Sequence, residues 1–244
     1  MCPPSALEQL SSSQAPGQEI FPNARTDIPA CVPTDPLSLA AYAYVRAHLH
    51  PLILAHSLRT YIHAKTLSVA PEYAPWHTSA HLPLLFVACM FHDMGTSAVC
   101  DGPQRFEVEG ADAAAAFIAS HAPDTPKSDV HEVWVAIALH TSPGIAERIS
   151  ILARLVHGAV LADFHMSHPD ACVDQKDVEA AERAFPRGEI EKVLGDEVAV
   201  QAEQAQQPER KAPPATWPGE LLRSKRENPG WAGVNKGLLF SYGR

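Results

Sequence analysis

The stretch "LPLLFVACMFHDMG", residues 82–95, predicts a buried helix that ends on two polar side chains. An almost wholly apolar run leads up to His92 and Asp93, and Gly95 is the kind of residue at which helices stop. A histidine and an aspartate are costly to bury unless hydrogen bonds or a cation satisfy them. The stretch therefore indicates either turn chemistry at a helix end or a pair of metal ligands.

Helical periodicity extends on both sides of this stretch, and no segment shows the alternation bounded by turns that is typical of strands. Thr34 or Asp35 is expected to cap the first helix, with Pro36 at its first position. The sequence therefore predicts an all-α fold. The predicted helical segments are residues 37–49, 51–67, 82–95, 108–121, 129–140, 147–164 and 176–185.

The composition limits the size, partners and compartment of the protein. A chain of 244 residues can bury one sizeable core, and its net charge of −9 argues against binding nucleic acid by phosphate neutralisation. No apolar run is long enough to span a membrane, and nothing at the N-terminus predicts a secretory signal. Five scattered cysteines without a CxxC pair fit reduced thiols. We expect a cytoplasmic protein with no nucleic-acid or membrane partner, whose apolar helix faces would permit a homo-oligomer.

Composition divides the chain into four parts. Residues 1–36 are rich in Pro, Ser and Gln and predict an irregular arm, whereas residues 37–198 form the helical domain. Residues 199–218 are low in complexity and predict a linker. Residues 219–244 form a C-terminal tail that holds enough Trp, Leu and Phe to dock onto the domain or a partner.

Two further helical segments carry polar side chains on apolar faces. His56, Arg59 and His63 share one stripe of the segment 51–67, because residues three, four and seven positions apart lie on one face of a helix. The apolar stripe of the segment 147–164 ends at Asp163. An unpaired buried aspartate is destabilising by several kcal/mol, so Asp163 needs a cation or several hydrogen-bond donors.

His56, His92, Asp93 and Asp163 together make a candidate set of metal ligands. Two imidazoles and two carboxylates that converge from three helices match the preference of a divalent metal such as Zn, Fe or Mn. Each residue taken singly has a structural explanation, as a satisfied core histidine, a helix cap or half of an ion pair. As a set on successive apolar helices, the four residues favour a metal site.

The order of these groups resembles the HD-domain superfamily of metal-dependent hydrolases over roughly residues 37–190. Within that superfamily the chain is most similar to the cyanamide hydratase-like proteins of fungi, through "AHSLR" (55–59), "MFHDMGT" (90–96) and "AFPRG" (184–188). The resemblance implies an HD-domain helical bundle over residues 37–198. It also implies a divalent metal, with Zn²⁺ expected first and Fe²⁺, Mn²⁺ or Ni²⁺ compatible, held by His56, His92, Asp93 and Asp163.

The same resemblance implies an enzyme, a metal-dependent hydrolase or hydro-lyase that acts on a small-molecule substrate. The expected reaction is hydration of cyanamide or a related nitrile to urea or an amide by a metal-bound hydroxide. The catalytic residues expected are Asp93, Glu107 and His140, and the substrate-binding residues expected are Arg59, Thr96 and Glu109.

Several of these residues leave alternatives open. Glu107 and Glu109 can act as bases, or they can simply occupy the first turn of their helix, where an ionised carboxylate is favoured. His140 can orient substrate, protonate a nitrogen or cap its own helix end. Arg59 can hold a carboxylate of the protein or an anionic substrate, and His63 is expected to be structural.

Two other functions compete with hydration of a nitrile. The first is an HD-type phosphohydrolase that acts on a nucleotide or another phosphate ester, a substrate that usually needs a cluster of cations absent near these motifs. The second is a binding module without metal, which the intact ligand set argues against. One ion or two is also open, because His121 and His131 could join His140 in a second site.

Overall fold

The computed structural model describes residues 28–228 and residue 230, and every regular element in that part of the chain is helical, which confirms the all-α prediction. Most of the predicted N-terminal arm (residues 1–27) and the end of the predicted tail (residues 229 and 231–244) lie outside the described residues. The α-helices are α1 (Pro36–His48), α2 (Pro51–Leu67), α3 (Leu82–Phe91), α4 (Phe106–His121), α5 (Lys127–Leu139), α6 (Ala146–Ile149), α7 (Ile151–Asp163), α8 (Gln175–Ala184), α9 (Ile190–Gln204), α10 (Pro208–Lys211) and α11 (Trp217–Glu227), and the short 3-10 helices are η1 (Pro71–Trp76), η2 (Met94–Thr96), η3 (Ala98–Cys100) and η4 (Pro169–Ala171).

Capping side chains set two of the helix starts that matter for the site. Asp35 caps α1 by accepting a hydrogen bond from the backbone N–H of Ser38 at 2.9 Å, as predicted. Ser150 has extended backbone angles, and its hydroxyl accepts from the N–H of Ala153 at 3.1 Å. The prediction of one helix over residues 147–164 is therefore wrong at Ser150, because this side chain ends α6 and starts α7.

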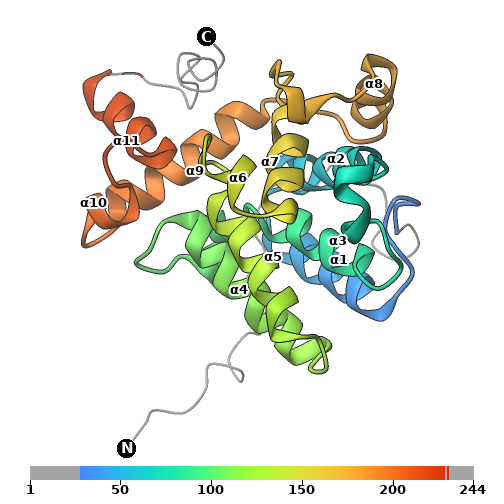
Figure 1. Cartoon of the computed structure of the whole chain (residues 1–244). Helices are drawn as coiled ribbons and strands as arrows, with labels where there is room; N and C mark the ends of the chain where they lie inside the picture. The colour runs from blue at the N-terminus through green and yellow to red at the C-terminus, as the bar shows by residue number, and fades with distance from the viewer. Residues whose placement is uncertain (1–27, 229, 231–244) are drawn as a thin grey trace, which may run out of the picture.

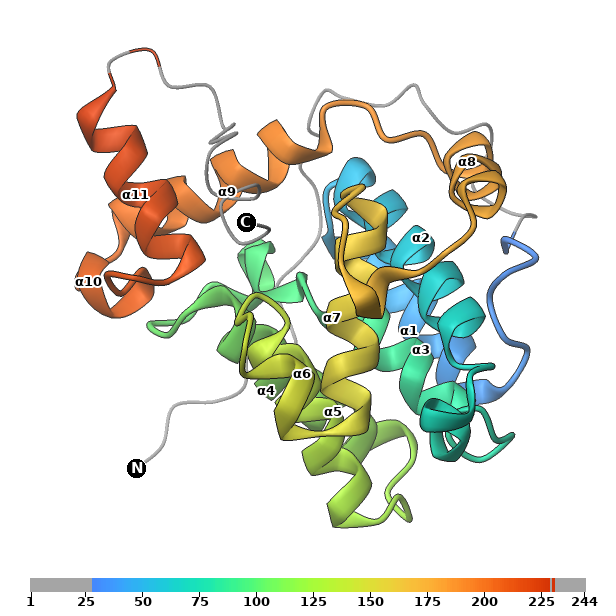
Figure 2. The same cartoon turned by 45° about the horizontal axis from the view of Figure 1, so that its top comes forward.

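Helix α7 lies at the centre of the fold (Figures 1 and 2). It packs against α2 on one side and against α5 on the other, and α3 packs against α1, α2 and α5. Every residue of α3 from Leu84 to Phe91 is buried, so this helix has no solvent-facing side. Polar side chains that follow α3 therefore lie inside the molecule.

The chain turns sharply after α3, at Gly95. A Cβ atom on Gly95 would lie 1.9 Å from the carbonyl oxygen of Phe106, at the start of α4, so only glycine permits this approach of two backbones. Helix α3 ends at Phe91, earlier than the glycine suggested, and His92 and Asp93 lie in the turn that leads into η2. The turn is thereby wedged between α3 and α4 with its polar side chains facing inward.

The C-terminal segment departs from the interpretation of residues 199–218 as a linker. Residues 199–204 continue α9, and α10 and α11 follow at one end of the molecule (Figure 1, orange to red). Ala202, Ala212 and Leu222 pack together in a small buried cluster of their own. The low-complexity composition misled because Ala, Gln and Glu are also strong helix formers.

Two sequence-based expectations concern the chain as a whole. Among residues 28–228, no helix combines the length and the apolar character needed to cross a membrane. Cys31, Cys89, Cys100 and Cys172 are all free thiols, as expected from their spacing, and Cys2 lies outside the described residues.

Candidate metal centre

Three ligand atoms meet where the turn after α3 faces the middle of α2. One ligand atom each from His56, His92 and Asp93 lies within 4.8 Å of the other two, and all three residues are buried. The Nε2 atoms of the two histidines are 3.0 Å apart. Oδ2 of Asp93 lies 3.5 Å from Nε2 of His56 and 3.2 Å from Nε2 of His92.

A hydrogen bond at the opposite nitrogen fixes each of these imidazole rings. Nδ1 of His56 lies 2.6 Å from Oδ2 of Asp163, and Nδ1 of His92 lies 2.7 Å from the carbonyl oxygen of Cys89. Both oxygens can only accept, so in a neutral ring Nδ1 carries the proton and donates it. The Nε2 lone pairs are left free and face Asp93, which is the tautomer that metal-ligating histidines adopt.

Asp93 is the residue that most clearly requires a cation. Its side chain is 1% exposed, and neither carboxylate oxygen has a hydrogen-bond partner among the described residues. Oδ1 has only Nε2 of His140 near it, at 3.5 Å. Burial raises the pKa of Asp93, but the nearby imidazoles of His92, His140 and His56 outweigh burial and lower it. An ionised carboxylate that faces three imidazole lone pairs is stabilised only if the rings take up protons or a metal ion binds.

The spacing of the three donor atoms fits a divalent metal ion. Metal–ligand bonds of about 2.0 to 2.2 Å place neighbouring ligand atoms roughly 3 to 3.5 Å apart around a tetrahedral or octahedral ion. The separations of 3.0, 3.2 and 3.5 Å between His56, His92 and Asp93 match this range. Two imidazoles and one carboxylate are a donor set used by both Zn²⁺ and Fe²⁺, with coordination positions left for water or substrate.

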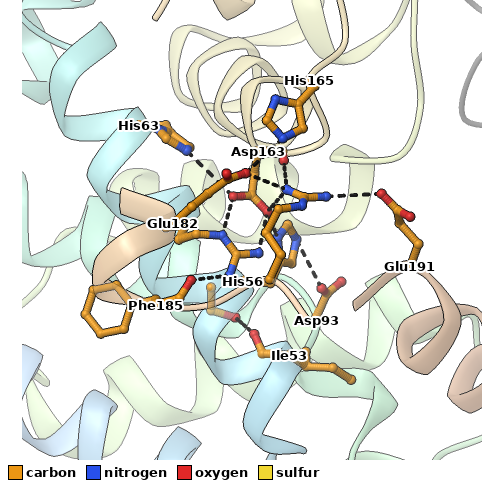
Figure 3. Close-up of polar contacts among 12 residues, drawn as sticks. Ile53, His56, His63, Asp93, Asp163, His165, Glu182, Phe185 and Glu191 are labelled. Atoms are coloured by element: carbon orange, nitrogen blue, oxygen red, sulfur yellow. Dashed lines mark hydrogen bonds and ion pairs between the residues drawn. The ribbon is translucent and has the colours of Figure 1, made fainter. Parts of the chain in front are cut away.

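Asp163, the fourth expected ligand, contacts the opposite edge of the His56 ring. Arg59 donates to both of its oxygens, from Nε at 2.6 Å and from Nη2 at 2.9 Å. In Figure 3, dashed lines join Asp163 to His56 and His63, and join His56 in turn to Asp93. Burial raises the pKa of Asp163, but His56, His63 and Arg59 outweigh burial and hold the pKa well below its usual value. The contacts give Asp163 the role of orienting His56, and direct binding of the metal by Asp163 stays a prediction.

Arg59 is fully buried, and protein oxygens surround its guanidinium group. Besides Asp163, it donates from Nη1 to the carbonyl oxygen of Phe185 at 2.9 Å. Arg187 donates to the backbone carbonyl of Asp163, so the "AFPRG" segment (184–188) lies directly against this carboxylate. Of the two roles left open for Arg59, these contacts show the one of holding a carboxylate of the protein.

A small cavity of about 70 Å³ opens beside the three ligand residues. His140 and Thr141, from the end of α5, form part of its wall together with His56, His92 and Asp93. The rest of the wall is largely apolar and is formed by residues of and just after α7, together with α9 and α11. These include Val160, Leu161, Phe164, Met166, Leu194 and Trp217.

His140 fulfils one of the roles that the sequence left open, that of capping its own helix end, and its contact with substrate stays a prediction. Its Nδ1 lies 2.7 Å from the carbonyl oxygen of Ile137, so the ring caps the end of its own helix through this nitrogen. Its Nε2 points the other way, to Oδ1 of Asp93 at 3.5 Å, on the wall of the cavity. The free lone pair of His140 is therefore available to a molecule bound there.

Glu107 lies behind the cavity wall. It is fully buried, and its Oε1 accepts from Nη2 of Arg105 at 2.6 Å and from the hydroxyl of Thr141 at 2.5 Å. Thr141 lines the cavity whereas Glu107 does not. Glu107 is thus placed to position Thr141, and its predicted catalytic role would act through that residue.

Glu109 and Thr96, expected to bind substrate, are likewise outside the cavity lining. Glu109 accepts from the backbone N–H of Gln104 at 2.6 Å and so holds the loop before α4. The hydroxyl of Thr96 donates to the backbone carbonyl of Asp93 at 2.7 Å. Both side chains bind backbone groups a few residues earlier in the chain instead of facing the cavity. The sequence pattern alone did not reveal this.

Among the cavity-lining residues that the sequence did not predict, His157 and Trp217 are the ones with ring nitrogens. His157 lies six positions before Asp163 and therefore off the stripe that ends there, and Trp217 lies in the segment interpreted as a linker. The histidines suggested for a second metal site do not gather. His121 and His131 are exposed, stacked on Phe117 and Trp134, and the described residues contain one group of three metal-capable side chains.

Comparison with known proteins finds a similarity in the central part of the chain. No curated protein matches it. Residues 53–159 match the family model of the HD domain, a span that includes His56, His92 and Asp93 and stops short of Asp163. The helical fold and the buried His-His-Asp cluster agree with this match. The match covers less than half of the chain, so residues 53–159 are similar to the HD domain, a type of domain found in metal-dependent hydrolases.

Proposed function

We propose that this protein is a metal-dependent hydrolase that adds water to a small uncharged molecule, with cyanamide or a related nitrile as the preferred substrate. The observation that carries the proposal is the cavity beside the His56, His92 and Asp93 cluster, which is small and contains no lysine or arginine in its lining. Size and charge each favour such a substrate over a phosphate ester.

The size of the cavity favours a molecule of a few non-hydrogen atoms. A cavity volume of about 70 Å³ has room for a few water molecules, since one buried water needs roughly 10 to 15 Å³ by this measure. Cyanamide and short nitriles are of this size, whereas a nucleoside monophosphate is several times larger.

The charges around the cavity point the same way. Sites that bind phosphate usually present several arginine, lysine or backbone donors. The arginines in or near the motifs are all engaged, Arg59 with Asp163, Arg105 with Glu107, and Arg187 with the Asp163 carbonyl and Glu191. The cavity therefore offers a phosphate group no free cation apart from a bound metal.

In the proposed hydration reaction, the metal ligands, His140 and the cavity wall each have a separate role. A divalent ion held by His56, His92 and Asp93 would supply Lewis acidity, which lowers the pKa of a water ligand towards neutrality and polarises the substrate. His140 presents a free Nε2 lone pair and can take up a proton and return it to the product nitrogen. The apolar wall excludes bulk water, and Thr141, held by Glu107, shapes the cavity beside His140.

The experiment combines metal analysis with a substrate panel. Protein purified without chelator is expected to contain about one divalent ion per chain, with Zn²⁺ expected first and Fe²⁺, Mn²⁺ and Ni²⁺ as alternatives. The loaded protein is then assayed for urea formed from cyanamide, for amides formed from short nitriles, and for phosphate released from nucleotides. Phosphate release without nitrile hydration would overturn the proposed substrate class. Failure to bind any divalent ion would overturn the metal centre itself.

A further inference from the structure

Asp93 differs from the other two candidate ligands in how its side chain is held. Hydrogen bonds at Nδ1 fix the imidazole rings of His56 and His92. The carboxylate of Asp93 has no hydrogen-bond partner among the described residues. Its place in the cluster therefore depends on the backbone of the turn that carries it, residues 93–97.

Side-chain donors bind three carbonyl groups of this turn. The hydroxyl of Thr96 donates to the carbonyl of Asp93 at 2.7 Å. The hydroxyl of Ser97 donates to the carbonyl of Met94 at 2.7 Å. The third donor, Nε2 of Gln201, belongs to α9 and donates to the carbonyl of Thr96 at 2.9 Å. Because the first two donors are part of the turn itself, Gln201 is the one of these three that ties the turn to a distant helix.

Helix α9 packs against this turn as well as donating to it. It contacts η2, and its residues Val198 and Ala199 pack together with Phe106 and Leu221 in a buried cluster. The backbone of Phe106 is the group that approaches Gly95 so closely that only glycine fits. The turn is therefore supported by the start of α4 and by α9 together.

The stability of the fold does not by itself explain the burial of Gln201. The residue is 8% exposed, and its Oε1 has no hydrogen-bond partner among the described residues. An unsatisfied buried acceptor is unfavourable, and it offsets what the hydrogen bond to Thr96 contributes. A buried amide that stabilises the fold so little suits a role in holding the Thr96 carbonyl in one position.

We propose that Gln201 is a positioning residue for the metal centre, and that it acts on Asp93 through the backbone of Thr96. Nε2 of Gln201 holds the carbonyl of Thr96, and Thr96 donates to the carbonyl of Asp93 from its hydroxyl at 2.7 Å and from its N–H at 3.0 Å. This inference rests on the metal centre of the proposed function. The positioning group lies outside the span similar to the HD domain, since α9 begins well beyond residue 159.

Gln201→Met tests the inference, because methionine has nearly the length of glutamine and no N–H to donate. The variant exchanges one unsatisfied acceptor, Oε1 of Gln201, for another, the carbonyl of Thr96. Its midpoint of unfolding in urea should therefore stay within about 0.3 M of the wild type. Its affinity for Zn²⁺, measured by competition with a chelator of known affinity, should fall about fivefold, the effect of roughly one hydrogen bond. An unchanged affinity would overturn the inference.

Lys211→Met is the matched control. Lys211 is likewise a buried side chain of the C-terminal helices that donates to a backbone carbonyl, that of Gly102 at 2.6 Å, and it also pairs with Asp101 at 2.7 Å. These partners follow η3, several residues after the turn that carries Asp93. We expect Lys211→Met to unfold at a lower urea concentration than the wild type and to keep its metal affinity. Equal losses of metal affinity in Lys211→Met and Gln201→Met would refute the specific role of Gln201.

Thr96→Val tests the path to Asp93, because valine keeps the shape of threonine and lacks the hydroxyl that donates to the Asp93 carbonyl. In the double variant with Gln201→Met, the loss of metal affinity should be smaller than the product of the two single losses, since both act through one chain of contacts. A loss equal to that product would refute the path through Thr96.

Bound Co²⁺ gives a readout that does not depend on turnover or on stability. Its visible absorption depends on the number and arrangement of its ligands. The spectrum of Gln201→Met should differ from that of the wild type, because the Asp93 carboxylate is displaced. The spectrum of Lys211→Met should match the wild type. A wild-type spectrum in Gln201→Met would contradict the positioning role.

Different results refute the positioning role and the proposed reaction. Weaker metal binding in Gln201→Met, together with no hydration of cyanamide by the wild type, would support the positioning role and refute the reaction. Hydration of cyanamide by the wild type, together with wild-type metal affinity in Gln201→Met, would support the reaction and refute the positioning role. All of these measurements use the full chain.

Discussion

Two buried aspartates lie on opposite edges of the His56 ring, and they differ in how they are satisfied. Both oxygens of Asp163 accept strong hydrogen bonds, from Arg59 and from Nδ1 of His56. Neither oxygen of Asp93 has a hydrogen-bond partner in the described chain, although it is buried almost as completely. Within the described residues, the fold thus supplies hydrogen-bond donors to the carboxylate of Asp163 and none to that of Asp93.

The difference indicates what each carboxylate does. Asp163 is neutralised by a buried arginine and contacts the imidazole of His56, contacts that suit a role in stability and in orienting a ligand, while direct metal binding by Asp163 stays a prediction. Asp93 faces Nε2 lone pairs and an apolar cavity, so its charge is balanced only when a cation binds or the imidazoles take up protons. The predictions below test this contrast between a satisfied and an unsatisfied carboxylate.

The largest effect is expected from Asp93→Asn, which removes the unsatisfied charge and keeps the shape. The variant should lose its bound divalent ion and at least about a thousandfold in turnover, because an amide is a poor ligand and the metal chemistry is lost. Metal content and turnover are measured together on the purified protein.

The stability of the metal-free Asp93→Asn variant provides the second half of this test. Since Asp93 has no hydrogen-bond partner to lose, we expect unfolding of the apo variant in urea to be as difficult as that of the apo wild type, or more so. Retained metal with lost turnover would instead make Asp93 a base that moves a proton.

The next largest effect is expected from Arg59→Met, which leaves Asp163 as an uncompensated buried charge. The free energy of unfolding should fall by about 3 to 5 kcal/mol, measured by urea denaturation at neutral pH. Arg183→Met is the matched control, because Arg183 is an exposed arginine that faces Glu179 at 3.8 Å. Its change should stay within about 0.5 kcal/mol, and a similarly small loss in Arg59→Met would contradict the contrast.

Asp163→Asn is expected to weaken metal binding by roughly tenfold to a hundredfold, because the carboxylate that orients His56 is lost while the three ligand residues remain. Competition with a chelator of known affinity measures this change. Asp170→Asn serves as the control, since Asp170 pairs with Arg154 at 2.5 Å away from the cluster and should leave the metal affinity unchanged. Complete loss of the metal at saturating concentration would instead show that Asp163 is itself a ligand.

The smallest effect concerns pH. The pKa of Asp163 is lower in the folded chain than its usual value, so the ionised form stabilises the fold. This stabilisation is complete above the pKa of an unfolded aspartate, about 4, and is lost as the pH falls below it. We expect the unfolding free energy of the wild type to fall more steeply than that of Asp163→Asn below about pH 4, by at most about 1.4 kcal/mol per pH unit. Parallel curves would show that Asp163 does not carry this charge.

The helices and their amphipathic faces could be predicted from local chemistry. The Asp35 cap and the burial of α3 follow from residues close together in the chain, and the structure agrees with both. The break at Ser150 was missed because a serine in an apolar helical stretch is compatible with either a helix interior or a cap. The helices within residues 199–218 were missed because a segment rich in Ala, Gln and Glu has the same composition whether it forms helices or a low-complexity linker.

Sequence alone determined the all-α fold and the residue types that approach a metal, because helical periodicity and the burial of His92 and Asp93 are properties of short stretches. Only the tertiary structure decided which groups meet. It brought Asp163 against Arg59 and Nδ1 of His56, drew Glu107 to Arg105 and Thr141, and brought Trp217 from a distant helix to the cavity wall. The physical reason is that each buried polar side chain faces the nearest complementary partner, and that partner is set by how distant helices pack.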